Sequence, residues 1–120
     1  MVMLAAQAEL VARKRYYLKD EDNEPIENAD GMFRRVADAI GAAETNYGKL
    51  PVEAELSAND FYSVMSALEF IPNSPTLMNA GTEQGTLSAC FVLPLEDSME
   101  GIMKAAHDAA MVQKFGGGTG

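Results

Sequence analysis

The pattern of apolar residues changes at Pro72, and this change constrains what the chain can fold into. Up to Leu68, apolar side chains recur at helical spacing, whereas residues 72–86 are rich in Pro, Asn, Ser, Thr and Gly. A short, nearly continuous apolar run follows, which is typical of a strand buried on both faces in a parallel or barrel sheet. The sequence therefore predicts a mostly helical segment that leads into a buried strand.

Three helices are predicted before Pro72. The first runs from Val2 to Tyr17 and is followed by an acidic solvent loop over residues 19–25. The second has Asp30 as its N-cap and ends near Gly48, and the third has Ser57 as its N-cap. The residues predicted to face the core are Leu4, Ala8, Val11 and Ala12 in the first helix, Phe33, Val36, Ala37 and Ile40 in the second, and Phe61, Val64, Met65 and Leu68 in the third.

A strand and a helix are predicted after the irregular run. The strand covers Thr86 to Leu93 and contains Cys90, the single cysteine of the chain. The helix extends from Ser98 to about Lys114, with Asp97 as its cap. Its inner face is predicted to consist of Met99, Ile102, Met103, Ala106 and Ala110.

The charge balance and the cysteine content exclude several classes of protein. A formal net charge of −9 without a basic stripe disfavours a nucleic acid polymer as partner. The N-terminus lacks the pattern of a signal peptide, and no run of about 18 apolar residues is long enough to cross a membrane. A single cysteine excludes an internal disulfide framework and is typical of a reducing compartment, so a cytoplasmic protein is expected.

The residues alone leave the chemistry open. Cys90 lies in a predicted buried strand, where a free cysteine is either a small core side chain or a catalytic thiol. The glycine run over residues 116–120 and the hydroxyls of Ser74, Thr76 and Ser88 are suited to a phosphate, although no Walker sequence is present. The lone His107 is predicted to lie at the surface, and no metal site is expected.

Three motifs in this order resemble the adenosylcobalamin-dependent (class II) ribonucleotide reductases. They are Asn-Ser-Pro-Thr-Leu-Met-Asn-Ala-Gly from residue 73, Ser-Ala-Cys-Phe-Val-Leu from residue 88 and Phe-Gly-Gly-Gly-Thr-Gly from residue 115. Parts of residues 15–37 are also similar to the helical lead-in of that family. The resemblance implies an α/β fold in which N-terminal helices over residues 1–70 lead into the first strands and helix of a ten-stranded barrel over residues 71–120, incomplete in this chain.

The resemblance also implies an activity and a set of partners. Members of this family reduce ribonucleoside diphosphates to 2′-deoxyribonucleoside diphosphates by adenosylcobalamin-initiated radical chemistry. They use a thiol reductant such as thioredoxin and a deoxynucleoside triphosphate effector, and the dimeric branch binds this effector at the dimer interface. Cys90 matches the first member of the reducing cysteine pair. The positions matched to substrate binding are Ser74, Ala89, Cys90, Gly116 and Gly117, and those matched to effector binding are Asp97, Ser98, Met99 and Lys114.

The sequence departs from the family pattern in one respect. The second reducing cysteine, the cysteine that carries the thiyl radical and most of the cobalamin site have no counterpart in these 120 residues. The chain is therefore expected to be inactive alone, and a second polypeptide or a longer sequence would complete the barrel. Two alternatives remain: a fragment of the metal-dependent class I large subunit, or a non-catalytic fragment that binds a nucleotide or a partner.

Overall fold

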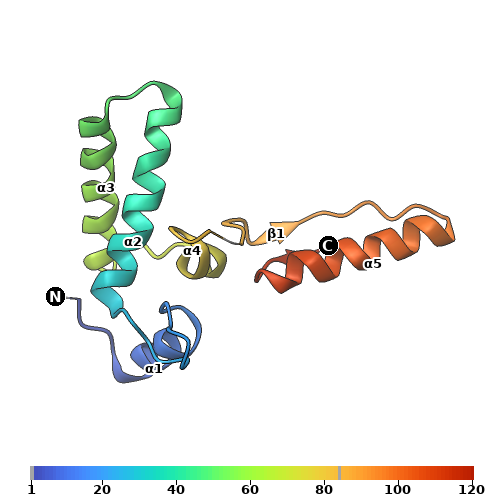
Figure 1. Cartoon of the computed structure of the whole chain (residues 1–120), viewed down its shortest axis with the longest axis horizontal. Coiled ribbons are helices and arrows are strands. Elements are labelled where there is room, and N and C mark those ends of the chain that lie inside the picture. Colours follow the sequence, from blue (N-terminus) through green and yellow to red (C-terminus); the bar gives the residue numbers. More distant parts are fainter. Residues whose placement is uncertain (1, 84) are drawn as a thin grey trace. The chain divides into compact units, whose positions relative to one another are not determined.

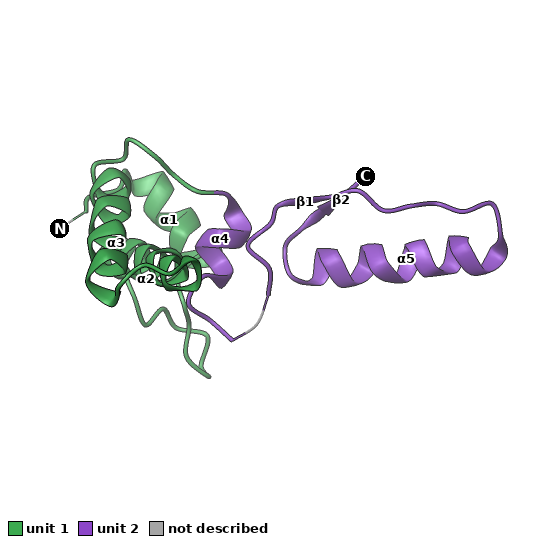
Figure 2. Ribbon diagram, turned by 90° about the horizontal axis from the view of Figure 1, so that it is seen from above, with its two compact units in different colours: residues 1–72 green, residues 73–120 purple. Residues whose placement is uncertain are grey.

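The computed structural model describes residues 2–83 and 85–120, which form two compact units over residues 1–72 and 73–120 (Figures 1 and 2). The first unit is helical, and the second contains a pair of short strands joined by a helix. Unit 1 contains α1 (Ala6–Arg15), α2 (Ala29–Ala42), the 3-10 helix η1 (Ala43–Tyr47) and α3 (Pro51–Ser66). Unit 2 contains α4 (Ser74–Asn79), β1 (Cys90–Phe91), α5 (Met99–Lys114) and β2 (Gly118–Thr119).

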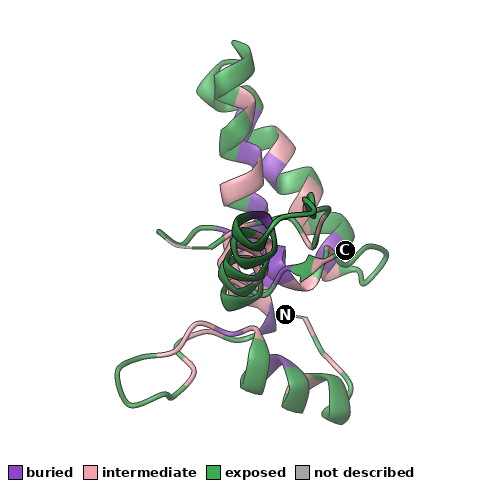
Figure 3. Ribbon diagram, turned by 90° about the vertical axis from the view of Figure 1, so that its right-hand side faces the viewer, coloured by how far each residue is buried: buried purple, intermediate pink, exposed green. Residues whose placement is uncertain are grey.

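The core of unit 1 lies between α2 and α3, which are packed side by side (Figure 1). The predicted face of α2 is confirmed for Phe33, Val36 and Ala37, which are almost completely buried. Figure 3 colours the buried parts of the ribbon purple. The facing residues of α3 are Ala54, Ala58 and Met65. Because two of these three are alanines, the helix axes can approach closely.

Glycine at position 41 permits this close approach. A Cβ atom there would lie 2.6 Å from the Cβ of Ala58 and 2.9 Å from the carbonyl oxygen of Ala54. Real Cβ atoms do not approach other atoms so closely, so a larger residue would push the helices apart. After η1, Gly48 adopts a left-handed conformation with φ of 83° and ends the turn between α2 and α3.

The predicted starts of the second and third helices are wrong. Asn28, not Asp30, caps α2, because its Oδ1 accepts the backbone N–H of Gly31 at 2.9 Å. α3 begins at Pro51, six residues before the predicted cap Ser57, since proline suits a first helical turn whose N–H groups have no partner within the helix. Glu53 adds a carboxylate that accepts the backbone N–H of Leu50 at 2.8 Å.

The earlier start of α3 also changes the face that packs on α2. Ala54, Ala58 and Met65 turn toward the core, whereas Val64 and Leu68 of the predicted stripe are 38% and 48% exposed. Leu68 lies beyond the helix, with a positive φ of 59°. In α1, which is shorter than the predicted Val2–Tyr17, Ala12 is the buried member of the predicted face.

The two strands of unit 2 are parallel, and α5 provides the crossover between them (Figure 2). The predicted strand over Thr86–Leu93 is reduced to Cys90–Phe91, which pair with Gly118 and Thr119. Burial on both faces was predicted wrongly for this chain, because Cys90 is exposed and Val92 is 92% exposed. Within the described residues β1 has one strand neighbour, so little covers it.

Two further predictions for unit 2 need correction. Part of the run predicted to be irregular, Ser74–Asn79, is the short helix α4, because the Asn73 side chain caps it and Pro75 suits its first turn. Gln84, in the same run, lies outside the described residues. In α5 the cap is Ser98 rather than Asp97, since its Oγ accepts the N–H of Gly101 at 3.0 Å.

The predicted inner face of α5 is exposed in this chain. Met99 and Met103 are 74% and 62% exposed, and Ile102, Ala106 and Ala110 are exposed as well. Gly101 is the buried residue of this helix, and the side that includes Val112 is partly covered. The pattern of the helix was recognised correctly, but the small second unit contributes too few residues to cover its apolar side.

Candidate functional site

The parallel strand pair brings together four of the residues predicted to bind substrate. Cys90 is paired with Gly118, and the N–H of Gly118 donates to the carbonyl oxygen of Ala89 at 2.6 Å. Gly116 and Gly117 come directly before β2. The Cys90 segment and the glycine-rich segment are therefore neighbours in space although α5 separates them in sequence.

Gly117 fits its place only because it has no side chain. It is buried, and a Cβ atom would lie 2.6 Å from Cγ1 of Val112 and 3.0 Å from the ring of Phe91. Gly116 adopts a left-handed conformation with φ of 87°, which disfavours other residues. The glycines thus allow the chain to leave α5 and return directly beside β1.

Helix α4 joins this arrangement through two side chains. The hydroxyl of Thr76 donates to the carbonyl oxygen of Leu87 at 3.0 Å. The amide nitrogen of Asn79 donates to the carbonyl oxygens of Thr86, at 2.7 Å, and Phe115, at 3.2 Å. Ser74, predicted to contact substrate, is the first residue of the same helix.

Sequence reasoning had assigned no role to Asn79 or to Gly85, which lies against its side chain. Their signal was weak. Asn79 lies within the first motif and Gly85 lies four residues after it, but an Asn or a Gly in an irregular run is most simply a turn residue. The structure shows instead that Asn79 ends a helix and reaches two other segments.

The Cys90 thiol is free and exposed. An accessible thiol can attack a disulfide or be attacked within one, whereas a buried core cysteine cannot. The exposure follows from how little covers β1 within the described residues, so both roles that the sequence left open stay open here.

The residues predicted to bind an effector lie at the two ends of α5. Asp97, Ser98 and Met99 are at its N-terminus, where Ser98 caps the helix. Lys114 is in its last turn, with its ammonium group 5.3 Å from the centre of the Phe115 ring. A helix of 16 residues is about 24 Å long, so Lys114 does not share a site with the other three within one chain.

Lys104, His107 and Asp108 of α5 form a surface cluster. His107, predicted to lie at the surface, is exposed, and its Nδ1 is 3.1 Å from a carboxylate oxygen of Asp108. The hydrogen bond from Lys104, and then that from His107, holds the pKa of Asp108 below its usual value. Among residues 2–83 and 85–120, no three side chains of His, Cys, Asp or Glu are grouped to hold a metal ion.

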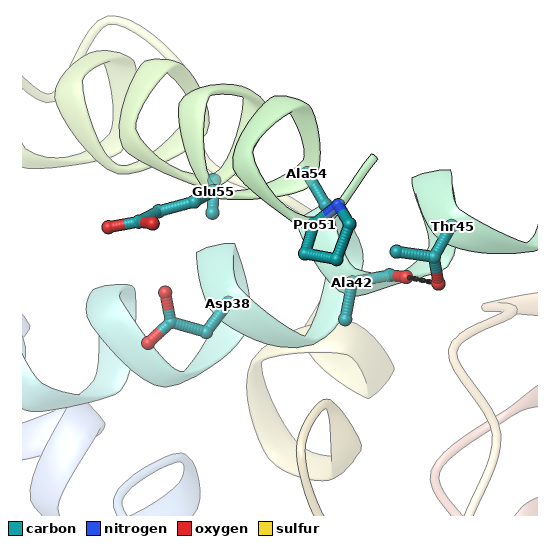
Figure 4. Close-up of a pocket in the computed structure, with 7 residues that line it drawn as sticks. Asp38, Ala42, Thr45, Pro51, Ala54 and Glu55 are labelled. Carbon is teal, nitrogen blue, oxygen red and sulfur yellow. Dashed lines mark hydrogen bonds between the residues drawn. The ribbon is translucent and has the colours of Figure 1, made fainter. Parts of the chain in front are cut away.

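A groove of about 320 Å³ lies on unit 1 and contains none of the predicted site residues (Figure 4). Its floor is apolar, with Ala42, Ala54 and Ala58, and the carboxylates of Asp38 and Glu55 lie along it. Two negative charges at its edge make this groove unsuitable for an anionic nucleotide. No helix in the described part of the chain is long and apolar enough to cross a membrane.

Comparison with known families identifies the class of protein. Residues 3–85 match the all-alpha domain of ribonucleotide reductases, and residues 88–120 match their barrel domain. The chain therefore belongs to the ribonucleotide reductase family. It consists of an N-terminal helical domain followed by the start of the barrel domain, and the fold expected from the three motifs is confirmed.

Similarity to individual relatives is strong among vitamin B12-dependent enzymes. The chain is 44% identical over 117 residues to a vitamin B12-dependent ribonucleoside-diphosphate reductase of Mycobacterium tuberculosis, covering 98% of this chain and 17% of the relative. The enzyme of the same name from Thermoplasma acidophilum is 38% identical, with 98% and 22% covered. The ribonucleoside-diphosphate reductase subunit alpha of Helicobacter pylori is 37% identical, with 88% and 13% covered. The chain thus spans less than a quarter of the length of each.

Proposed function

We propose that this chain provides the helical domain and the first part of the catalytic barrel of an adenosylcobalamin-dependent ribonucleoside-diphosphate reductase. The observation that carries the proposal is the position of Cys90 on a strand that pairs with the glycine-rich segment, which brings two of the three motifs together. The vitamin B12-dependent relatives, at 44% and 38% identity, support the choice of class. The product would supply DNA precursor synthesis, and the lone thiol suits a reducing cytoplasm.

In this proposal Cys90 is one of two cysteines that reduce the substrate. The two thiols together give two electrons and two protons: one proton leaves with the 2′-hydroxyl of the ribose as water, and the other proton and both electrons form the new C2′–H bond. The two sulfurs become a disulfide. Thiol–disulfide exchange with an external dithiol such as thioredoxin restores the pair. Because the chain has a single cysteine, the second thiol has to come from outside these 120 residues.

The other predicted residues receive roles consistent with their positions. Ser74, Ala89, Gly116 and Gly117 are proposed to bind the ribonucleoside diphosphate around Cys90. Backbone N–H groups of a glycine-rich segment can approach phosphate oxygens without a net positive charge. Asp97, Ser98 and Met99 are proposed to bind a deoxynucleoside triphosphate effector at the start of α5 in the homodimer of the complete enzyme. Lys114 remains a weaker member of this set because it lies at the other end of α5.

No residue of this chain is assigned to the cofactor. Adenosylcobalamin would supply the radical that starts the reaction. We propose that most of the cofactor site is formed by the portion of the enzyme outside this sequence.

The metal-dependent class I large subunit is a second candidate, since the Helicobacter pylori subunit alpha is 37% identical to this chain. A non-catalytic fragment that binds a nucleotide or a partner is a third. The cofactor requirement of the completed enzyme separates the first two. Turnover that depends on adenosylcobalamin supports our proposal, and turnover that depends on a separate metal-containing radical subunit supports class I.

The role of Cys90 can be tested in the chain joined to the remaining barrel of a vitamin B12-dependent relative. We expect Cys90→Ser to abolish multiple turnover with a dithiol reductant, whereas Ser63→Ala, on an exposed part of α3, leaves turnover unchanged. Steady-state turnover of the Cys90→Ser variant would remove Cys90 from the reducing pair. The 120-residue chain alone should form no deoxynucleotide, and product from it would contradict the proposed division of the site.

A further inference from the structure

We infer that Asn79 is a positioning residue, which fixes the spacing between the Cys90 segment and the glycine-rich segment through two hydrogen bonds to backbone carbonyls. Its significance for substrate binding rests on the proposed function, because the two segments are those proposed to contact the ribonucleoside diphosphate. Asn79 itself is not proposed to touch substrate. It ends α4 and is half-buried.

The hydrogen-bond partners define the orientation of the Asn79 amide. Both partners, the main-chain oxygens of Thr86 and Phe115, can only accept hydrogen bonds. The NH₂ group must therefore face them, and each of its two hydrogens has one partner. Thr86 lies four residues before Cys90, and the Phe115 carbonyl belongs to the peptide group that continues into Gly116. One side chain thus joins the segments before β1 and β2.

Two neighbours hold Asn79 in this role. Thr76, one turn earlier on the same helix, donates to the carbonyl oxygen of Leu87, so α4 binds two consecutive carbonyls of the segment before β1. Gly85 lies flat against the Asn79 amide: a Cβ atom there would be 2.4–2.7 Å from its atoms. With φ of +100°, position 85 also requires a conformation that other residues rarely adopt.

The strand pair needs such support because it is very short. Each strand has two residues, and the neighbouring backbone hydrogen bonds run from Gly118 to Ala89, from Gly120 to Phe91 and from Leu93 to Gly120. A pair of strands is only marginally stable by itself even when it is longer. Asn79 connects the same two segments from outside the ladder, so loss of its donors should loosen the pairing.

Amide hydrogen exchange of the 120-residue chain, followed by NMR, tests this inference without nucleotide, reductant or cofactor. Asn79→Asp keeps the shape of the side chain but replaces the two donors with an oxygen that repels both carbonyls. We expect the protection of the Gly118 and Gly120 amides to fall at least tenfold at pH 8, because two part-buried hydrogen bonds are lost. Asn79→Leu, which also lacks donors but carries no charge, should lower it as well.

Asn73→Asp provides a matched control in the same helix. There the side-chain oxygen accepts the N–H of Thr76 at 2.9 Å, and a carboxylate accepts equally well. We expect the protection of the Gly118 amide in this variant to stay within threefold of that in the parent chain. The amides of α2 and α3, read in the same spectra, should be unchanged in all three variants because they belong to unit 1.

A pH profile separates a donor role from general loss of packing. A carboxyl group facing two carbonyls is stabilised in its protonated form, which can donate one hydrogen bond. The loss of protection in Asn79→Asp should therefore be smaller at pH 5.5 than at pH 8, whereas that in Asn79→Leu should not depend on pH.

The inference is overturned if the protection of the Gly118 and Gly120 amides in Asn79→Asp stays within threefold of that in the parent chain at pH 8. It is also overturned if Asn73→Asp lowers this protection as much as Asn79→Asp does. A loss of protection spread equally over unit 1 would also overturn it. None of these results depends on reductase activity. The inference can thus fail while Cys90 is still shown to be redox-active, and it can hold if Cys90 is not.

Discussion

Replacement of Gly41 by alanine tests whether close packing of α2 on α3 determines the stability of unit 1. In an open helix, Gly→Ala stabilises by about 1 kcal/mol because alanine loses less conformational entropy. At position 41 the new Cβ would lie 2.6 Å from Cβ of Ala58 and 2.9 Å from both the Ala54 oxygen and the Ala58 Cα. Two of these three are main-chain atoms, which cannot rotate away.

The sign of the effect follows from comparing the two terms. Overpacking of a well-packed contact costs about 1–3 kcal/mol, and contact with rigid main-chain atoms places Gly41 at the upper end. Subtracting the helix-propensity gain leaves a net loss of about 1–2 kcal/mol for Gly41→Ala. Gly31, in the first turn of the same helix, is the matched control, since its new Cβ would meet side-chain atoms at 3.4 and 3.6 Å. Gly31→Ala should therefore gain up to about 1 kcal/mol.

Tyrosine emission during urea unfolding reports the unfolding free energy of unit 1 alone, and so measures the difference in stability between Gly41→Ala and Gly31→Ala. The chain has no tryptophan, and all four of its tyrosines lie within residues 1–72. We expect the two variants to differ in unfolding free energy by about 2 kcal/mol, with Gly41→Ala the less stable. If Gly41→Ala is as stable as the parent chain, or if the order of the two variants is reversed, the α2–α3 distance does not limit packing here.

Two further variants test polar contacts of unit 1. Arg35→Ala should lower the unfolding free energy by about 3 kcal/mol, because it leaves Glu27, whose side chain is 10% exposed, without its bidentate partner. Asp38→Ala breaks the ion pair between Asp38, which is 60% exposed, and Arg34, which is 35% exposed, so it should cost less than about 1 kcal/mol in the same urea titration. Tyr62→Phe removes the hydrogen bond that holds the pKa of Asp30 below its usual value, so that pKa should rise in a carboxyl NMR titration. The stabilisation from the ionised Asp30 is complete above pH of about 4 and is lost as pH falls through its lowered pKa, so the variant should lose less stability in acid.

The sequence predicted the helical part of the fold best where the apolar pattern was long and one-sided. Phe33, Val36 and Ala37 satisfy this condition, and all three are core residues. The start of α3 was missed because the serine at position 57 was predicted to cap the helix, whereas Pro51 occupies its first turn. Proline can either end a helix or begin one, and periodicity alone could not choose between these two roles.

Helix α4 and the exposed side of α5 were missed for different reasons. α4 has six residues, too few for a periodic pattern, and its side-chain contacts to Leu87 and Phe115 are tertiary. The apolar side of α5 was predicted to be buried because its pattern is that of a core helix. Burial depends on the elements available to cover it, and the described residues of unit 2 contribute only the two short strands and α4.

The predicted site illustrates what a motif can and cannot show. Cys90 and the glycine segment were singled out by residue type, and the parallel pairing brings them together in the structure. The motifs could not show how the pairing is maintained. The relevant hydrogen bonds link a side chain to main-chain carbonyls, and because every residue type has such a carbonyl, the sequence does not reveal which ones are used. Asn79 is recognised only when its partners at Thr86 and Phe115 are seen.

The length of α5 restricts how the proposed effector site can be built. Asp97, Ser98 and Met99 lie at one end, and Lys114 lies at the other, beside the Phe115 ring and two residues before Gly116. A nucleoside triphosphate is shorter than the roughly 24 Å of this helix, so one bound molecule cannot contact both ends of α5 in the same chain. A contribution from Lys114 to that site would therefore require the α5 of a second copy, whereas within one chain its charge lies next to the glycines proposed to hold the substrate diphosphate.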